Sequence, residues 1–447
     1  MGKILIKDAT TVNEGHVQQA SILIDDEVIA GIFSPDDSDI PAGCHVIDAR
    51  GRWLLPGAID DHVHFRDPGL THKADMATES CAAAAGGVTT VFDMPNCIPQ
   101  TVTLQALDDK YRRAAECCLV NHSFYLGATH DNIEDIEKLD RNLVCGIKLF
   151  MGSSTGGMLL DDRDSLRELF RAATVPVAVH CEKSSIINAN MEFYTKQCGG
   201  EPPVRFHPLI RSAEACYEST SLALDVAAGT NVHLHILHIS TAQELSLFRK
   251  GPVEGKQFTT EACPAHLWFT DDDYSSKGTL IKCNPAIKSA TDRDALRHAL
   301  NDGLIDVIGT DHAPHLLKEK TGGCKSAASG MPVLPYSLPV MLELTDQDIL
   351  NLTDVVRLMC HNPAQLFGIR ERGFIRKGYK ADLTLVSHSD DGWTAGPTNN
   401  HTKCKWSPFE GQQFHWKVDT TWVNGRAVYN NGEFDTTIKG QQVLFNR

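Results

Sequence analysis

Between residues 54 and 310 short apolar segments alternate with amphipathic helical stretches, and this alternation restricts the fold more than any other feature. Eight segments have the composition of buried β-strands: 54–62, 88–94, 121–128, 146–150, 177–180, 233–238, 258–263 and 307–310. The helices expected between them include 74–85, 104–117, 165–173, 212–228 and 291–301. Alternating strands and helices form a parallel sheet covered by helices. Eight such units predict an α/β fold, a TIM-type (β/α)8 barrel.

A doubly wound open sheet is the structural alternative for the same alternation. Dinucleotide-binding sheets of that kind carry Gly-x-Gly-x-x-Gly directly after the first strand. No such motif follows residues 54–62, so the barrel is favoured.

Both chain ends read as short strands separated by Gly, Pro and Asp turns. Asn424-Gly425, the strongest short hairpin signal, lies between two strand-like segments near the C-terminus. Neither end has an obvious core of its own. We therefore expect residues 1–52 and 373–447 to form one small composite β domain, and residues 53–372 to form the barrel domain.

The charge balance narrows the classes of partner. The formal net charge of −15 argues against a nucleic-acid or anionic-membrane surface, because the field of the whole protein repels both. A small anionic substrate would need local positive groups. The fourteen cysteines include no Cys-x-x-Cys pair, and no secretory signal or membrane-spanning run is visible. We expect free thiols and a cytoplasmic location.

The segment from Asp61 to Gly69 carries the first candidate site. It follows directly on the first barrel strand, so His62 and His64 are expected to project from the strand end on the same face. Imidazole pairs at this spacing suit zinc-like ions. Arg66 continues the alternation and offers a clamp for an anion beside the metal. The alternative to a metal site is that His62 and His64 are polar residues at a strand end with ordinary hydrogen-bond partners.

Later strand ends decide between these readings, because a barrel assembles its active site at the C-terminal ends of its strands. The fifth, sixth and eighth strands end at His180, His238 and Asp311, whereas His235 is expected to lie deeper. The fourth places Lys148 in an apolar run. Either a carboxylate neutralises this lysine, or the neutral amine takes up carbon dioxide as a carbamate that bridges two metal ions.

Several potential ligands at successive strand ends predict a metal-dependent hydrolase. Divalent ions lower the pKa of bound water, which makes hydroxide available near neutral pH. Asp311 is placed to act as the catalytic general acid and base toward a leaving nitrogen. The expected reaction is hydrolysis or closure of an amide-like bond.

These motifs resemble the amidohydrolase superfamily and, within it, the dihydroorotases. The superfamily signals, in the expected order, are His62, His64, Lys148, His180, His238 and Asp311. The resemblance implies two Zn2+ ions bridged by N6-carboxylysine at Lys148. One ion would be held by His62, His64 and Asp311, and the other by His180 and His238.

Narrower signals resemble dihydroorotases: 64–69, 94–96 and 311–315. The resemblance implies that Arg66, Asn96 and His315 bind the substrate carboxylate, and charge-assisted bonds make this physically sensible. Asn284 is expected at the substrate ring, although Asn-Pro is also a common turn. Gly330 is also expected to bind the substrate, and it belongs to segment 318–332, which is interpreted as a mobile loop over the site or as an inert connector.

The implied reaction is the reversible cyclisation of N-carbamoyl-L-aspartate to (S)-dihydroorotate in pyrimidine biosynthesis. The implied partners are a second copy of the chain in a dimer and other enzymes of that pathway. Allantoinase and hydantoinase (dihydropyrimidinase) are the enzymatic alternatives, and a non-catalytic scaffold is the alternative of another class. Pro264-Ala265-His266 departs from the pair of adjacent histidines in many dihydroorotases, which leaves the role of His266 open.

Overall fold

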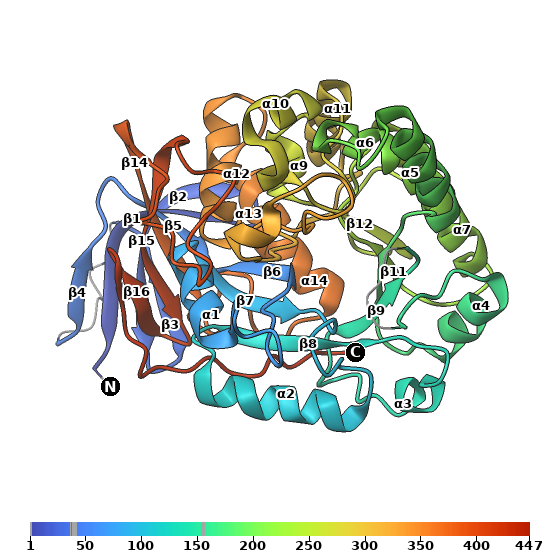
Figure 1. Ribbon diagram of the computed structural model, residues 1–447. Helices are drawn as coiled ribbons and strands as arrows, with labels where there is room; N and C mark the ends of the chain where they lie inside the picture. The colour runs from blue at the N-terminus through green and yellow to red at the C-terminus, as the bar shows by residue number, and fades with distance from the viewer. Residues whose placement is uncertain (1, 36, 38–42, 153–156) are drawn as a thin grey trace.

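The computed structural model describes residues 2–35, 37, 43–152 and 157–447. Two sheets organise the chain, an eight-stranded parallel sheet and a nine-stranded sheet beside it (Figure 1). The parallel sheet contains β6 Ala58–Val63, β7 Val88–Asp93, β8 Asn121–Gly127, β9 Gly146–Phe150, β10 Val177–His180, β11 Leu234–Ile236, β12 Phe258–Ala262 and β13 Val307–Ile308. These strands are neighbours in chain order.

The parallel sheet closes on itself beyond the last strand. A parallel bridge joins Val63 to His312, and the amide of His64 donates to the carbonyl of His312 at 2.8 Å. The TIM-type barrel predicted from the alternation is therefore confirmed.

Helices surround this barrel (Figure 1). The longer ones are α1 Met76–Ala85, α2 Leu104–Cys117, α4 Arg163–Ala172, α5 Ser184–Cys198, α7 Ala213–Ala227, α11 Ala290–Asp302 and α12 Ser337–Asp346. Five of them match the predicted helices, and each of those five begins after a side chain that accepts from a backbone amide of the first turn: Asp75, Thr103, Asp162, Ser212 and Ser289. The shorter helices are α3 Ile133–Glu137, α6 His207–Ile210, α8 Ala242–Leu245, α9 Pro264–Trp268, α10 Tyr274–Lys277, α13 Leu352–Val356 and α14 Asn362–Phe367.

The second sheet is built from both chain ends. Its strands are β1 Ile4–Asn13, β2 His16–Asp25, β3 Val28–Phe33, β4 His45–Asp48, β5 Trp53–Pro56, β14 Leu383–Thr394, β15 Gln413–Val423, β16 Arg426–Asn430 and β17 Glu433–Phe434. The predicted hairpin joins β15 to β16, where Asn424 and Gly425 have φ of 50° and 75°. Positive φ at both central residues is what a type I′ turn requires.

The expected strand 54–62 is two strands in two sheets. β5 pairs with β1 and β14, whereas β6 begins the barrel. Gly57 makes the turn between them, and a Cβ there would come within 2.2 Å of the Thr89 side chain. The small sheet thus extends past residue 52. Of the predicted range 1–52, residues 1, 36 and 38–42 lie outside the described part.

The last ten residues, 438–447, leave the small sheet and cross the N-terminal end of the barrel. The amide of Val443 donates to the carbonyl of His122 near the start of β8. Phe445 packs against Phe92 with ring centroids 5.9 Å apart, and Arg447 donates to the carbonyls of Phe367, Val144 and Cys145. This segment therefore seals the barrel instead of belonging to the small sheet.

All fourteen cysteines are free thiols, as the sequence predicts. In the described part of the chain, no helix combines the length and apolar character needed to cross a bilayer.

Candidate metal centre

The six predicted ligands stand at the C-terminal side of the barrel. His62 and Lys148 lie within β6 and β9, and His180 ends β10. The other three follow their strands by one to three residues: His64 after β6, His238 after β11 and Asp311 after β13. All except Asp311 are buried. His235 lies deeper, inside β11 and 3.1 Å from Asp61, as predicted.

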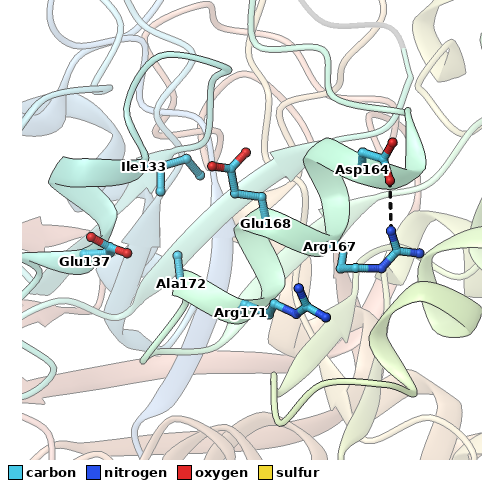
Figure 2. Close-up of a pocket in the computed structure, with 7 residues that line it drawn as sticks. All are labelled: Ile133, Glu137, Asp164, Arg167, Glu168, Arg171 and Ala172. Atoms are coloured by element: carbon cyan, nitrogen blue, oxygen red, sulfur yellow. Dashed lines mark hydrogen bonds and ion pairs between the residues drawn. The ribbon is translucent and has the colours of Figure 1, made fainter.

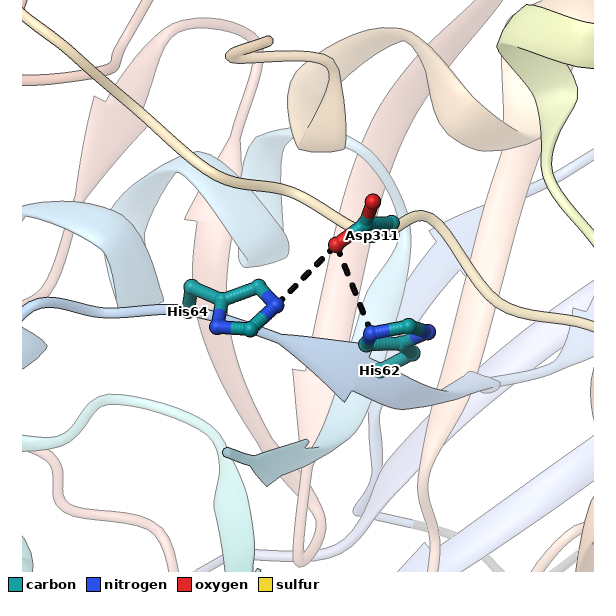
Figure 3. A group of neighbouring side chains, drawn as sticks. All are labelled: His62, His64 and Asp311. Carbon is teal, nitrogen blue, oxygen red and sulfur yellow. Dashed lines mark ion pairs between the residues drawn. The ribbon is translucent and has the colours of Figure 1, made fainter. Parts of the chain in front are cut away.

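His62, His64 and Asp311 form a tight group (Figure 3). The Nε2 atoms of His62 and His64 lie 3.3 Å and 3.0 Å from the same oxygen of Asp311. Burial acts to raise the pKa of Asp311, but His62, His64 and Lys148, whenever they carry a proton, outweigh it and hold the pKa below its usual range. The carboxylate is therefore anionic and faces both rings.

The other nitrogen of each ring is already bound. His62 Nδ1 lies 2.9 Å from Glu261 Oε1, and His64 Nδ1 lies 2.7 Å from Asn96 Oδ1. If each Nδ1 carries the proton that it donates to these oxygens, each Nε2 presents a lone pair to the Asp311 carboxylate. Lone pairs and a carboxylate that converge on one point need a cation between them. The donor set therefore fits a zinc-like ion.

His180 and His238 form a second group beside the first. His180 Nδ1 lies 2.9 Å from His238 Nε2, and His180 Nε2 lies 2.9 Å from Glu182 Oε2. The rings of His238 and His62 are 5.4 Å apart, so the two groups adjoin. Among the described residues His238 Nδ1 has no hydrogen-bond partner. Burial lowers the pKa of His62, His180 and His238, which keeps them in the neutral form that binds metals.

Lys148 is buried without a compensating carboxylate contact. No ion pair or hydrogen bond of its ammonium occurs within the described part of the chain, and its nearest described aromatic partner is the Phe150 ring at 4.7 Å. Burial lowers the pKa of Lys148 to about 8. No carboxylate of the described residues pairs directly with this lysine, although the charges of Asp311 and Glu261 act to raise its pKa. A neutral amine is the form that reacts with carbon dioxide.

Strained backbone also occurs at this site, as it does at eight further non-glycine residues of the described chain. Arg66, His238 and Asp311 have φ of 63°, 40° and 49°, values that residues other than glycine rarely adopt. Such strain commonly marks residues held in a functional orientation. Here it occurs at two predicted ligands and at the predicted anion clamp.

Arg66 is aimed at His315 rather than at its sequence neighbour Asp67. Its Nη2 lies 3.0 Å from His315 Nε2, and its Nε donates to the Pro314 carbonyl at 3.1 Å. Asp67 pairs instead with Arg113 at 3.3 Å. Arg66 therefore does not form an ion pair with Asp67. The half-buried guanidinium forms no ion pair with a carboxylate of the described residues.

The remaining predicted substrate residues border this region. Asn96 reaches the metal centre through His64. Asn284 Oδ1 lies 3.2 Å from His207 Nε2. Gly330 has φ of 138°, and a Cβ there would come within 2.5 Å of the Ala313 carbonyl and 3.1 Å of the His315 ring. Only glycine fits this close approach.

The segment 318–332 is tied to the rest of the protein. Lys320 is buried and donates to the carbonyls of Lys282, Ala328 and Gly330. Glu201 accepts from the amides of three residues in the segment, 323, 325 and 326. These bonds hold the wall around His315 in one shape in this structure.

Sequence reasoning missed the residues that orient the ligands. Glu261 binds His62 through its side chain and also accepts from the His238 amide at 2.8 Å. Glu182 stands two residues after His180, a spacing that could have signalled its role. His266 contacts the Pro285 carbonyl at 3.0 Å, and burial lowers its pKa to about 4. Its contact is thus with the backbone beside Asn284.

A surface hollow between α3 and α4 is a different kind of feature (Figure 2). Charged side chains dominate its lining, and Arg167 pairs with Asp164 at 2.8 Å. Its seven lining residues include no histidine or cysteine. The hollow therefore lacks the chemistry found at the barrel mouth.

The barrel and its ring of histidines and carboxylates define a metal-dependent hydrolase. Residues 53–428 match the amidohydrolase family. The chain is 34% identical to the dihydroorotase of Methanosarcina mazei over 429 residues, 92% of this chain and 91% of that protein. It is 31% identical to the allantoinase of Streptomyces avermitilis over 98% of both chains. The structure of the L-hydantoinase (dihydropyrimidinase) from Arthrobacter aurescens superimposes with a TM-score of 0.90 at 30% identity, over 97% of this chain and 98% of that one.

The chain belongs to the amidohydrolase family and is a cyclic amidohydrolase. Its relatives include three kinds of enzyme with different substrates, so the choice among those substrates depends on the residues beside the metal centre.

Proposed function

We propose that the protein is a dihydroorotase, which interconverts N-carbamoyl-L-aspartate and (S)-dihydroorotate. The observation that carries this proposal is the half-buried Arg66 guanidinium, which lies beside His315 at the mouth of the metal centre and forms no ion pair with a carboxylate of the described residues. Both proposed substrates carry a carboxylate. Neither allantoin nor hydantoin has one.

The surroundings of His315 favour an anion. Lys73 Nζ lies 3.2 Å from His315 Nδ1 and can only donate, so Nδ1 accepts and Nε2 carries the ring proton. That N–H can donate to the Ser329 carbonyl at 3.1 Å and stands 3.0 Å from Arg66 Nη2. A substrate carboxylate can accept from both donors. Burial and these cations lower the pKa of His315 to about 2, so the ring donates as the neutral form.

We propose that two Zn2+ ions occupy the centre, with a carbamate on Lys148 between them. His62, His64 and Asp311 would hold one ion, and His180 and His238 the other. When bound, the ions would lower the pKa of coordinated water and supply hydroxide near neutral pH. Glu261, Asn96 and Glu182 would fix the histidine rings through their second nitrogens.

Asp311 would move the proton. Its anionic carboxylate can take a proton from the attacking water and return it to the leaving ring nitrogen, and the reverse transfers serve ring closure. Arg66 and His315, with Asn96, would hold the carboxylate so that the amide faces Asp311. Within this proposal the protein acts in the cytoplasm, as a dimer, in pyrimidine biosynthesis.

Two substitutions at Arg66 test the proposal. Loss of a buried charge pair costs about 2–5 kcal/mol, so Arg66→Met should lower kcat/KM for dihydroorotate by at least about 30-fold, because each 1.4 kcal/mol is tenfold. Arg66→Lys keeps the positive charge but loses the two parallel N–H donors of the guanidinium. Its kcat/KM should lie between those of wild type and Arg66→Met. Metal content measured in parallel should not change. Full activity of Arg66→Met with dihydroorotate would overturn the assignment.

A further inference from the structure

A second cluster of histidines and carboxylates lies away from the barrel mouth, where α12 packs against β15 and meets a side chain of β14 (Figure 1). Glu343 and Asp346 stand three residues apart on α12, so they share one side of the helix. His388 lies on β14 and His415 on β15. Three elements distant in the sequence thus contribute two carboxylates and two imidazoles to one place.

The distances are those of a potential ligand group. His415 Nδ1 lies 3.1 Å from Glu343 Oε2, and His388 Nε2 lies 3.2 Å from Asp346 Oδ2. One ligand atom each of Glu343, Asp346 and His415 falls within 4.8 Å of the others. The rings of His388 and His415 are 6.0 Å apart and nearly parallel.

We propose that Glu343, Asp346, His388 and His415 form a separate site for a zinc-class divalent cation. Imidazole nitrogen together with carboxylate oxygen is a common ligand set for zinc, and four such ligands complete a tetrahedral site. The site would clasp the barrel helix α12 to the small sheet.

The charge and exposure of the group support this use. The carboxylates of Glu343 and Asp346 lie side by side on α12, with ligand oxygens within 4.8 Å of each other, and need a positive partner, which is either a protonated histidine or a metal ion. The side chains of Asp346, His388 and His415 are 35%, 28% and 39% exposed, whereas Glu343 is buried. An ion can therefore enter from solvent and meet an anchored carboxylate.

The alternative to a metal site is a contact between α12 and the small sheet that is held by hydrogen bonds alone. Glu343 also accepts from the backbone amides of His415 and Trp416, and Asp346 accepts from the Trp416 indole at 3.1 Å. These bonds use the same oxygens, yet a carboxylate oxygen has two lone pairs and can bind an amide and a metal ion together. If the residues form a zinc site, added zinc should change the fluorescence and the thermal stability of the protein. If they form only a hydrogen-bonded contact, added zinc should change neither.

The test is a zinc count on the metal-loaded enzyme. The enzyme is dialysed against a low concentration of Zn2+, and zinc per chain is then measured during titration with further Zn2+. The double variant His388→Ala/His415→Ala should bind one zinc ion fewer per chain than wild type. His298→Ala is the matched control, because it removes an exposed histidine that follows an aspartate on α11 by one turn. The control should bind as much zinc as wild type.

Two further readouts distinguish a metal site from a hydrogen-bonded contact. The Trp416 indole contacts Asp346, so added Zn2+ should change tryptophan fluorescence in wild type and in His298→Ala but not in the double variant. Added Zn2+ should likewise raise Tm only where the site is intact. Equal zinc counts in wild type and double variant would overturn the proposal. So would a lower Tm of the double variant that is the same with and without Zn2+.

Discussion

The two ends of the barrel are built in opposite ways. At the N-terminal end, Phe92 and Phe445 pack together and Arg447 satisfies three backbone carbonyls, so apolar surface is covered and polar groups are paired. At the C-terminal end, Lys148 is buried and Arg66 half-buried without an ion pair to a carboxylate among the described residues, and His238 has an unpaired nitrogen. The C-terminal end thus contains unpaired charged and polar groups, which destabilise the fold, whereas the N-terminal end contains paired ones.

This difference teaches where function resides. A chain selected for stability alone would pair its buried charges and avoid strained backbone, and proteins usually depart from this at functional sites. The positive φ angles of Arg66, His238 and Asp311 lie at the C-terminal end. If the comparison is right, substitutions at the two ends should separate activity from stability.

The largest effect is expected at the C-terminal end. Asp311→Asn removes the proton acceptor but keeps the size of the side chain, so kcat should fall by about 10²–10⁴-fold. Because the side chain is not part of the apolar core, the Tm of the chelator-treated variant should stay close to that of chelator-treated wild type. Steady-state kinetics and thermal unfolding of the same preparation check this. A kcat near that of wild type would remove Asp311 from the proposed chemistry.

The N-terminal end should show the reverse. Phe445→Ala leaves a cavity beside Phe92 and should lower the free energy of unfolding by about 3–5 kcal/mol. The active-site residues are untouched, so kcat at 25 °C should not change. Denaturant unfolding monitored with the kinetics measures both quantities. A large loss of kcat in a folded Phe445→Ala variant would contradict the separation of the two ends.

An intermediate effect is expected for Lys73, which contacts His315 and Glu319. Hydrogen bonds to charged groups contribute about 1.5–3 kcal/mol, so Lys73→Met should raise KM for dihydroorotate roughly tenfold or more. The effect on kcat should be smaller, because Lys73 orients the carboxylate site and not the metal centre. Lys73→Arg should recover part of the affinity. A change in kcat alone would place Lys73 in another role.

The smallest effect concerns pH. The pKa of Lys148 is lowered from 10.5 to about 8 in the folded, metal-free protein. Between these values the unfolded chain binds the proton and the folded chain does not, so folding stability rises with pH there by about 1.4 kcal/mol per unit. Below about pH 8 the destabilisation is complete and constant. Lys148→Met should lack this slope when chelator-treated proteins are unfolded between pH 8 and 10, and an identical slope in both proteins would assign it to other groups.

The sequence allowed the main features of the C-terminal end to be predicted, because strand ends of a barrel converge whatever their separation along the chain. That rule brings His62, His180, His238 and Asp311 to one place. It does not specify which side chains support them, and Glu261 reaches His62 across 199 residues.

Other features depended on packing that periodicity does not encode. Residues 54–62 read as one apolar strand, and only the turn at Gly57 against Thr89 divides it between two sheets. The last ten residues have no strand pattern of their own, and they are placed by contacts with the start of β8 and with Phe92. The His388 and His415 cluster likewise arises from the contact of α12 with the small sheet.

The most direct test of the central claim is substrate choice by the unmodified enzyme. Purified, zinc-supplemented protein should be assayed side by side with dihydroorotate, allantoin and hydantoin, and with N-carbamoyl-L-aspartate in the direction of ring closure. We predict turnover of dihydroorotate in both directions, with kcat/KM at least about 100-fold above that for either neutral ring, equivalent to roughly 2.7 kcal/mol of discrimination by Arg66 and His315. Efficient hydrolysis of allantoin or hydantoin without turnover of dihydroorotate would contradict the account.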